Sequence, residues 1–302
     1  MDDARWTGGV GRNPSLATAP SSGRGRWPAL LVTLAALCSP CSHAEGTASP
    51  NTFRVCQDPN NLPFSNLNSE GFENRIAELL ASRLGWKVEY YSFPQRLGFI
   101  RNTLRFKLPG QDFACDVVMG VPARYDQAAP TRPYYRSTYV LVLGGKLTTL
   151  DSVEQFLALP AAQRDRLRIG VYDRSPGSAW LGRHDLVAQG VPYRILNADP
   201  DHNPGQIIEK DLASGAIDAA IVWGPIAGYV VKQHPEAGLR VIPLASEPGV
   251  ALEFEIAMGV RHGELEWKAT LDRLIVENQA QIDAILREYG VPLADAGGTP
   301  KL

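Results

Sequence analysis

The sequence has no excess of basic residues, few cysteines and no long hydrophobic run. Its 302 residues include 30 lysines and arginines against 32 aspartates and glutamates, so the formal net charge is −2. This balance argues against a nucleic-acid-binding protein, which needs a basic surface for the phosphate backbone. With 44% hydrophobic and 21% charged residues, the composition is that of a globular chain with one large or two moderate domains.

The sequence also lacks the common motifs of catalysis and metal binding. No nucleophile elbow, phosphate loop or dinucleotide fingerprint occurs, and after residue 44 no histidine or cysteine pair has metal-ligand spacing. Two small acidic groups, Glu70 with Glu73 and Asp199 with Asp201, are expected to cap helices or face solvent rather than hold a cation. We therefore predict a protein that is not an enzyme and carries no cofactor or metal.

Residues 1–44 have the pattern of a secretory signal peptide. Two arginines precede the short apolar run 28–38, and small residues follow up to Ala44. The run is too short to anchor the chain in a bilayer. We expect an exported chain cleaved near Ala44, with lipid attachment at Cys38 or Cys41 as the alternative. Removing this segment takes away four basic and two acidic residues, which moves the net charge to −4.

Segments with strand and helix patterns alternate from Thr52 onward. The expected strands cover residues 52–57, 87–93, 115–121, 139–143, 167–172, 193–197, 218–223, 239–244 and 254–260. The expected helices cover residues 71–85, 95–108, 150–159, 179–189, 206–214, 224–234 and 265–289. Strands separated by helix-length connections predict parallel sheets with helices on both faces.

The order of these segments predicts two doubly wound α/β lobes with a cleft between them. We expect the first lobe to comprise residues 45–143 and 250–302, and the second lobe to comprise residues 144–249. Hinge closure would take place at the crossovers 143–146 and 245–252. In open sheets of this kind, ligands bind beyond the carboxyl ends of the strands. The cleft is therefore the expected binding site.

Cys56 and Cys115 are the cysteines that remain after residue 44. In a sheet ordered 2-1-3, the first strand, which carries Cys56, lies beside the third strand, which carries Cys115. An even count in an oxidising compartment favours a disulfide, although two buried free thiols are the alternative. Closing a loop of this length stabilises the fold by about 4 kcal/mol on the chain-entropy model.

Several motifs resemble the amino-acid type of bacterial periplasmic solute-binding protein. They are Asp58-Pro-Asn-Asn-Leu-Pro-Phe64, Met119-Gly-Val-Pro-Ala-Arg124, Pro133-Tyr-Tyr135 and Asp218-Ala-Ala-Ile221. The resemblance covers nearly the whole chain after the signal peptide. It implies a periplasmic protein with the two-lobed fold of these carriers.

Four longer blocks resemble a more specialised family. Residues 56–66, 115–122, 221–229 and 257–261 are similar to binding-protein-like accessory proteins associated with periplasmic quinoprotein alcohol dehydrogenases. These are the J-type proteins of methanol-oxidation clusters. Resemblance to a family implies a shared fold, but it does not by itself establish what the protein binds or does.

The resemblance to amino-acid carriers also locates a ligand site, in which several positions have changed. Arg124 matches the arginine that binds the ligand carboxylate, with a surface ion pair as the alternative. Pro176, after Ser175, has no N–H to offer the carboxylate, and Asn61 replaces the covering aromatic. Trp223 stands where the carriers keep the aspartate that pairs with the ammonium. A free amino acid is therefore not the expected ligand, because an unpaired buried ammonium is costly.

The remaining lining is aromatic, with a few polar groups. It suits an apolar or aromatic small molecule or an inserted segment of a partner protein, although Tyr134 and Tyr135 could instead pack in the core. The predicted site residues are Asp58, Asn60, Asn61, Phe64, Arg124, Tyr134, Tyr135, Ser175 and Trp223.

The leading hypothesis is an accessory factor for a PQQ-dependent methanol or related alcohol dehydrogenase. By resemblance it would be a monomer that aids maturation or activation of this partner by binding part of it, or a small ligand, in the cleft. The alternative is the solute-binding component of an ABC transporter for a small non-amino-acid metabolite. An enzyme similar to cyclohexadienyl dehydratases would need a general acid or base in the cleft, and no matched position carries one.

Overall fold

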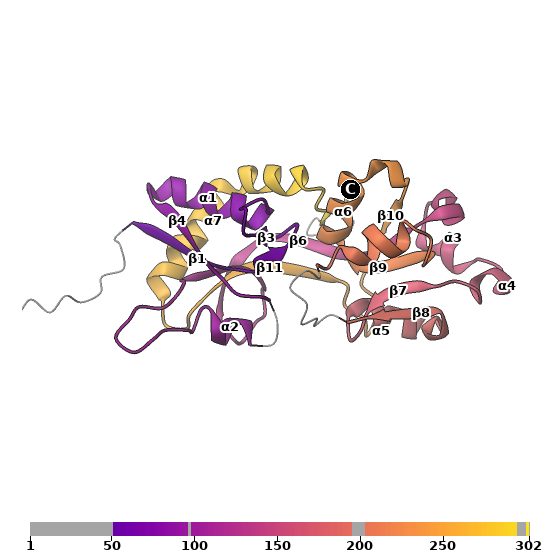
Figure 1. Cartoon of the computed structure of the whole chain (residues 1–302), viewed down its shortest axis with the longest axis horizontal. Helices are drawn as coiled ribbons and strands as arrows, with labels where there is room; N and C mark the ends of the chain where they lie inside the picture. Colours follow the sequence, from indigo (N-terminus) through magenta and orange to yellow (C-terminus); the bar gives the residue numbers. More distant parts are fainter. Residues whose placement is uncertain (1–50, 96–97, 195–202, 295–299, 302) are drawn as a thin grey trace, which may run out of the picture. The chain divides into compact units, whose positions relative to one another are not determined.

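The computed structural model describes residues 51–95, 98–194, 203–294 and 300–301 (Figure 1). The predicted signal peptide lies outside the described residues, as do Asp199 and Asp201. Among the described helices, none is long and apolar enough to cross a membrane.

Nine strands of the described chain form one mixed sheet with the order β4-β1-β5-β11-β6-β9-β7-β8, and β10 also pairs with β6. Their bounds are β1 (Thr52–Gln57), β4 (Lys87–Ser92), β5 (Val117–Pro122), β6 (Ala129–Leu143), β7 (Ile169–Tyr172), β8 (Gly190–Tyr193), β9 (Ala219–Trp223), β10 (Arg240–Pro243) and β11 (Glu253–Val260). β1 is parallel to β4 and β5, and β7 is parallel to β8 and β9. The predicted 2-1-3 order is therefore confirmed in β4-β1-β5. β6 and β11, by contrast, are antiparallel to their neighbours.

The long strand β6 is shared by both ends of this sheet (Figure 1). Up to Thr138 it pairs with β11, and from Tyr139 it pairs with β9 on one side and β10 on the other. We call the strands β4, β1, β5 and β11 the β1 half, and β9, β7, β8 and β10 the β9 half. The lobe boundaries expected at residues 143 and 250 stay predictions.

Successive side chains at the end of β6 point to opposite faces of the sheet, so they pack in two separate hydrophobic cores of the β9 half. Leu141 and Leu143 pack in the core that includes Trp180, whereas Val140 and Val142 pack in the core on the other face of the strand. All four side chains are fully buried. Residues 140–143 are therefore all hydrophobic, because both faces of the sheet are covered at this place.

The helices predicted over residues 71–85 and 265–289 are confirmed. α1 (Phe72–Leu84) and α7 (Leu265–Glu288) pack against each other on the β1 half. The other short elements are α2 (Phe99–Asn102), α3 (Val153–Leu157), α4 (Ala161–Arg164), α5 (Pro176–Arg183), α6 (Gly224–Gln233), the 3₁₀ turns η1 (Gly145–Thr149), η2 (Val187–Gln189) and η4 (Pro235–Ala237), the π-helix η3 (Ile207–Leu212), and the strands β2 (Asn60–Asn61), β3 (Ser65–Asn66), β12 (Leu293–Ala294) and β13 (Pro300–Lys301).

The prediction of a helix over residues 95–108 is wrong for most of that segment. Among the described residues of this segment, only α2 is helical, between Gly98 in the left-handed region and Thr103 at φ −127° and ψ −88°. The chain then forms a loop, in which Arg261 from beyond β11 donates to the carbonyl of Leu104. In a longer helix the Leu104 carbonyl would accept a backbone N–H of the same helix, whereas here it accepts a hydrogen bond from the Arg261 side chain.

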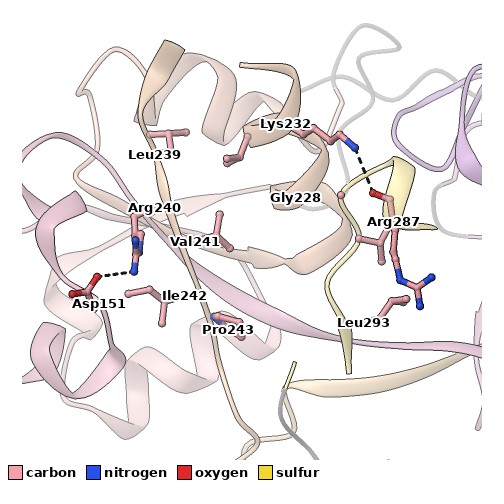
Figure 2. Close-up of a pocket in the computed structure, with 13 residues that line it drawn as sticks. Asp151, Gly228, Lys232, Leu239, Arg240, Val241, Ile242, Pro243, Arg287 and Leu293 are labelled. Carbon is pink, nitrogen blue, oxygen red and sulfur yellow. Dashed lines mark hydrogen bonds and ion pairs between the residues drawn. The ribbon is translucent and has the colours of Figure 1, made fainter. Parts of the chain in front are cut away.

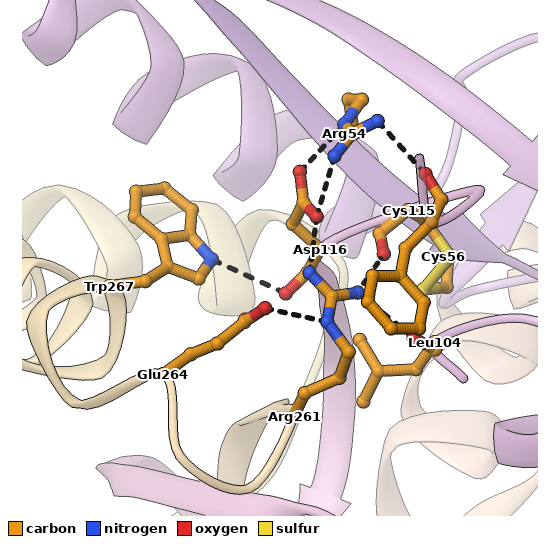
Figure 3. Close-up of polar contacts among 9 residues, drawn as sticks. Arg54, Cys56, Leu104, Cys115, Asp116, Arg261, Glu264 and Trp267 are labelled. Atoms are coloured by element: carbon orange, nitrogen blue, oxygen red, sulfur yellow. Dashed lines mark hydrogen bonds and ion pairs between the residues drawn. A yellow bond between two sulfur atoms is a disulfide. The ribbon is translucent and has the colours of Figure 1, made fainter. Parts of the chain in front are cut away.

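The predicted disulfide is confirmed between Cys56 on β1 and Cys115 before β5 (Figure 3). Next to it, the Asp116 carboxylate accepts two hydrogen bonds from Arg54, at 2.7 and 2.9 Å, and a third from Arg261. The backbone carbonyl of Asp116 accepts a hydrogen bond from the Trp267 indole of α7. The disulfide and Asp116, through its carboxylate and its backbone carbonyl, therefore tie β1, the start of β5 and α7 together.

The β9 half meets the end of α7 through two glycines. A Cβ added at Gly228 of α6 would lie 1.8 Å from the carbonyl oxygen of Gly290, and Gly290 itself has φ +73°. Next to these glycines the rings of Tyr229 and Tyr289 stack with their centroids 6.0 Å apart. Only glycine at both positions permits this backbone contact.

We predict that Gly228→Ala lowers the free energy of unfolding by at least about 2 kcal/mol, because the backbones must separate. The matched control is Gly182→Ala in α5, where an added Cβ meets no atom within 4 Å. The free energy of unfolding of Gly182→Ala should rise by about 0.5–1 kcal/mol, since alanine stabilises a helix more than glycine does. Urea unfolding of both variants checks this, and a Gly228→Ala variant as stable as the wild type would contradict the contact.

Candidate functional site

Trp223 lies where β9 ends and α6 begins, and its ring faces two other aromatic side chains. Trp223 is paired with Tyr139 of β6, with ring centroids 5.4 Å apart. Phe254 of β11 lies 5.9 Å from Trp223 and 6.3 Å from Tyr139. We call these three residues the aromatic triangle. All three remain partly exposed, so they offer an aromatic surface at the place where β6 changes partners.

Trp223 also packs against the buried hydrophobic cluster of the β1 half. The cluster that it packs against includes Tyr135, which is only 7% exposed. Burial raises the pKa of Tyr135 well above its ordinary value, and the Glu73 carboxyl raises it further, while the Trp223 N–H lowers it. The Tyr135 ring contacts Phe72, which contacts Phe64. Aromatic contacts therefore continue from the triangle into the β1 half.

Glu73 is the residue whose role the sequence prediction missed. It lies in the first turn of α1, as expected, but its carboxyl packs against Gly120 of β5, where an added Cβ would lie 2.3 Å from Oε1. Burial, and then the Asp58 carboxylate, raise the pKa of Glu73 to about 8. At pH 7 Glu73 is therefore mostly a neutral acid, which can both donate and accept a hydrogen bond.

The spacing of α1 contained the signal for Glu73. Glu73, Ile76, Ala77 and Leu80 fall at positions i, i+3, i+4 and i+7, which share one helical face. The last three are buried. A carboxyl on the buried stripe of a helix is a candidate for a perturbed pKa rather than for a cap.

The first loop brings four predicted site residues together near Glu73. The Asp58 carboxylate accepts hydrogen bonds from the backbone N–H groups of Asn60, at 2.8 Å, and Gln95. Asn61 donates its side-chain amide to the Gln95 side chain at 2.9 Å. Phe64 packs on Phe72 with ring centroids 5.3 Å apart. These bonds fix the conformation of the loop beside α1.

The other predicted site residues have different surroundings. Tyr134 is 1% exposed and donates to the carbonyl of Met119 at 2.9 Å, so it packs in the core. Ser175 caps α5: its hydroxyl accepts from the N–H of Ser178 and donates to the Tyr172 carbonyl. Arg124 is exposed after β5 and has no hydrogen bond or ion pair with another described residue. A role for these three residues in ligand binding stays a prediction.

Comparisons with known proteins agree with the mixed α/β fold described above. No protein-family model matches the chain. The crystal structure of the periplasmic binding protein XoxJ from Methylobacterium extorquens AM1 is 37% identical, covers 80% of this chain and 99% of its own, and superimposes with a TM-score of 0.63. Protein MoxJ from Methylorubrum extorquens is 29% identical over 298 residues, covering 88% of this chain and 92% of MoxJ. Protein MoxJ from Paracoccus denitrificans is 28% identical over 293 residues, covering 87% and 99%.

The mixed α/β sheet and these similarities define the class of the protein as a type II periplasmic binding protein. Within that class, the chain belongs to the family of XoxJ and MoxJ.

We predict that Glu73 makes the stability depend on pH. Between the ordinary pKa of 4.5 and the raised value of about 8, the unfolded state has lost the proton that the folded state keeps. Stability therefore falls as pH rises through this window. Glu73→Gln removes this loss, so it should be more stable than the wild type by about 1–3 kcal/mol at pH 8 and show little difference at pH 4.5.

Thermal and urea unfolding across this pH range measure the effect. The matched control is Glu78→Gln, on the exposed face of the same helix. An equal pH dependence in Glu73→Gln and the wild type would show that the Glu73 carboxyl ionises freely in the folded protein.

Proposed function

We propose that the chain is a periplasmic accessory binding protein for a PQQ-dependent methanol or related alcohol dehydrogenase. It aids maturation or activation of the enzyme by binding a segment of it, or a small ligand, at the aromatic triangle. The proposal includes export through the signal peptide of residues 1–44. The disulfide supports it, since disulfides persist in oxidising compartments. Membership of the XoxJ and MoxJ family supports the binding role.

The observation that carries the proposal is the setting of Trp223. By resemblance it occupies the position of the ammonium-binding aspartate of amino-acid carriers, and its ring packs against the buried hydrophobic cluster of the β1 half. The nearby Glu73 is neutral at pH 7, and Asp58 accepts two backbone N–H groups. These groups offer an ammonium little compensation for its lost hydration. A free amino acid is thus a poor ligand for this site.

An aromatic or aliphatic side chain suits the site better. The rings of Trp223, Tyr139 and Phe254 present apolar area with little side-chain entropy left to lose, which is typical of binding hot spots. The site therefore favours an inserted segment of the dehydrogenase over a charged metabolite.

We predict that Trp223→Ala abolishes capture of the dehydrogenase from a periplasmic extract of a strain that expresses both proteins. Loss of a central aromatic anchor costs about 2 kcal/mol or more, roughly a thirtyfold weaker complex. Phe254→Ala should act in the same direction. Pull-down with apo- and holo-dehydrogenase, followed by calorimetry on the purified pair, measures the change.

The matched control is Phe106→Ala, an exposed aromatic whose ring stacks on Tyr91 instead. This variant should capture the enzyme as well as the wild type does. Melting curves establish that each variant is folded. Failure of the wild-type protein to bind either form of the dehydrogenase would overturn the proposal.

We further predict that Trp223→Asp does not create an amino-acid carrier. Asn61 bonds to Gln95 rather than covering a ligand, and Pro176 has no N–H for a carboxylate, so one aspartate restores only part of the clamp. Calorimetry with arginine, glutamine and glutamate should show no binding at millimolar concentration. Micromolar binding would instead identify a slightly altered transport protein and favour the solute-binding alternative.

A further inference from the structure

A second concave surface lies away from the aromatic triangle, between β10, α6 and the end of α7 (Figure 2). It is a groove of about 900 Å³. The residues of β10, together with Leu239, form one wall. Gly228 and Lys232 of α6, Arg287 of α7 and Leu293 form the opposite side. We call it the β10 groove.

The β10 wall is an open sheet edge. Among the described residues, β10 pairs with β6 alone. The N–H of Leu244 bonds to the Tyr139 carbonyl, so in an antiparallel ladder Ile242 also faces β6 while Val241 and Pro243 point their backbone groups outward. Pro243 fits this assignment, because its missing N–H would lie on the unpaired side. Val241 therefore offers a free N–H and C=O to a further strand.

The groove combines apolar side chains with an excess of positive charge. Lys232, Arg240 and Arg287 line it, against the single carboxylate of Asp151. Asp151 forms an ion pair with Arg240 at 2.6 Å. Lys232 donates to the carbonyl of Glu288 at 2.6 Å, which fixes its ammonium without a neutralising carboxylate.

Arg287 adds to this excess, since it meets Asp283 only at 3.8 Å and its side chain is 66% exposed. Positive charge is thus concentrated here in a chain whose net charge is negative. Beside these cations lie partly exposed apolar side chains of Leu239, Val241 and Leu293.

We propose that the β10 groove binds an extended acidic segment of a partner protein. The main chain of the segment pairs with the outward N–H and C=O of Val241, as in other additions of a strand to a sheet edge. Its carboxylates meet Lys232 and Arg287, and its aliphatic side chains lie against Leu239 and Leu293. Charge complementarity selects an acidic partner and excludes a basic one.

The probe is a short fluorescein-labelled peptide of alternating glutamate and valine, added to the full-length chain and followed by fluorescence anisotropy. We expect saturable binding that weakens as salt is raised. Arg287→Glu should weaken binding roughly tenfold, and the double variant with Lys232→Gln should weaken it further. The matched control is Arg273→Glu, an exposed arginine elsewhere on α7, which should bind the peptide as the wild type does.

Two further peptides test the apolar contacts and the sign of the charge. Replacing valine by serine should weaken binding roughly tenfold, and replacing glutamate by lysine should abolish it. Protection of the Val241 amide from hydrogen exchange in the complex would support strand addition. No peptide binding by the wild type, or equal loss in Arg287→Glu and Arg273→Glu, would overturn the proposal, and so would equal affinity for the serine peptide.

This proposal is independent of the function proposed above. Trp223→Ala should leave peptide binding at the β10 groove unchanged, while Arg287→Glu should leave the aromatic triangle intact. The two proposals can therefore fail separately.

Discussion

The continuity of β6 is the constraint on which the rest of the structure depends. One strand of fifteen residues pairs first with β11 and then with β9 and β10, so both halves of the sheet share a single backbone. Tyr135 and Tyr139 lie on either side of the change of partners, four residues apart. Trp223 packs on the Tyr139 ring and against the buried cluster that includes Tyr135. The aromatic triangle exists because this strand holds its members in register.

The chemistry of the site follows from its low polarity. The carboxyl of Glu73 packs against the backbone of Gly120 and beside aromatic side chains, and burial outweighs the favourable field at the start of α1. A neutral acid can make hydrogen bonds without needing a counter-charge.

Much of the architecture could be predicted from local patterns. The face of α1, the long helix α7 and the order of the first three strands follow from periodicity and connection length, and the disulfide follows from that order. The prediction of a helix over residues 95–108 was wrong for most of that segment. The hydrophobic residues there have helical spacing, but Arg261 donates a hydrogen bond to the carbonyl of Leu104. The spacing of α1 places Glu73 on the buried face of the helix. It was nevertheless predicted to cap the helix or face solvent, because acidic residues in a first turn ordinarily cap the helix.

The sequence by itself determined the class of fold and the disulfide, because each rests on patterns within a segment or on the order of segments. Only the tertiary structure decided that Trp223 lies with Tyr139 and Phe254, that Glu73 is desolvated, and that β10 leaves an open edge beside Lys232 and Arg287. These features join residues far apart in the chain. Their energies depend on burial and on distances between side chains, which no local pattern contains.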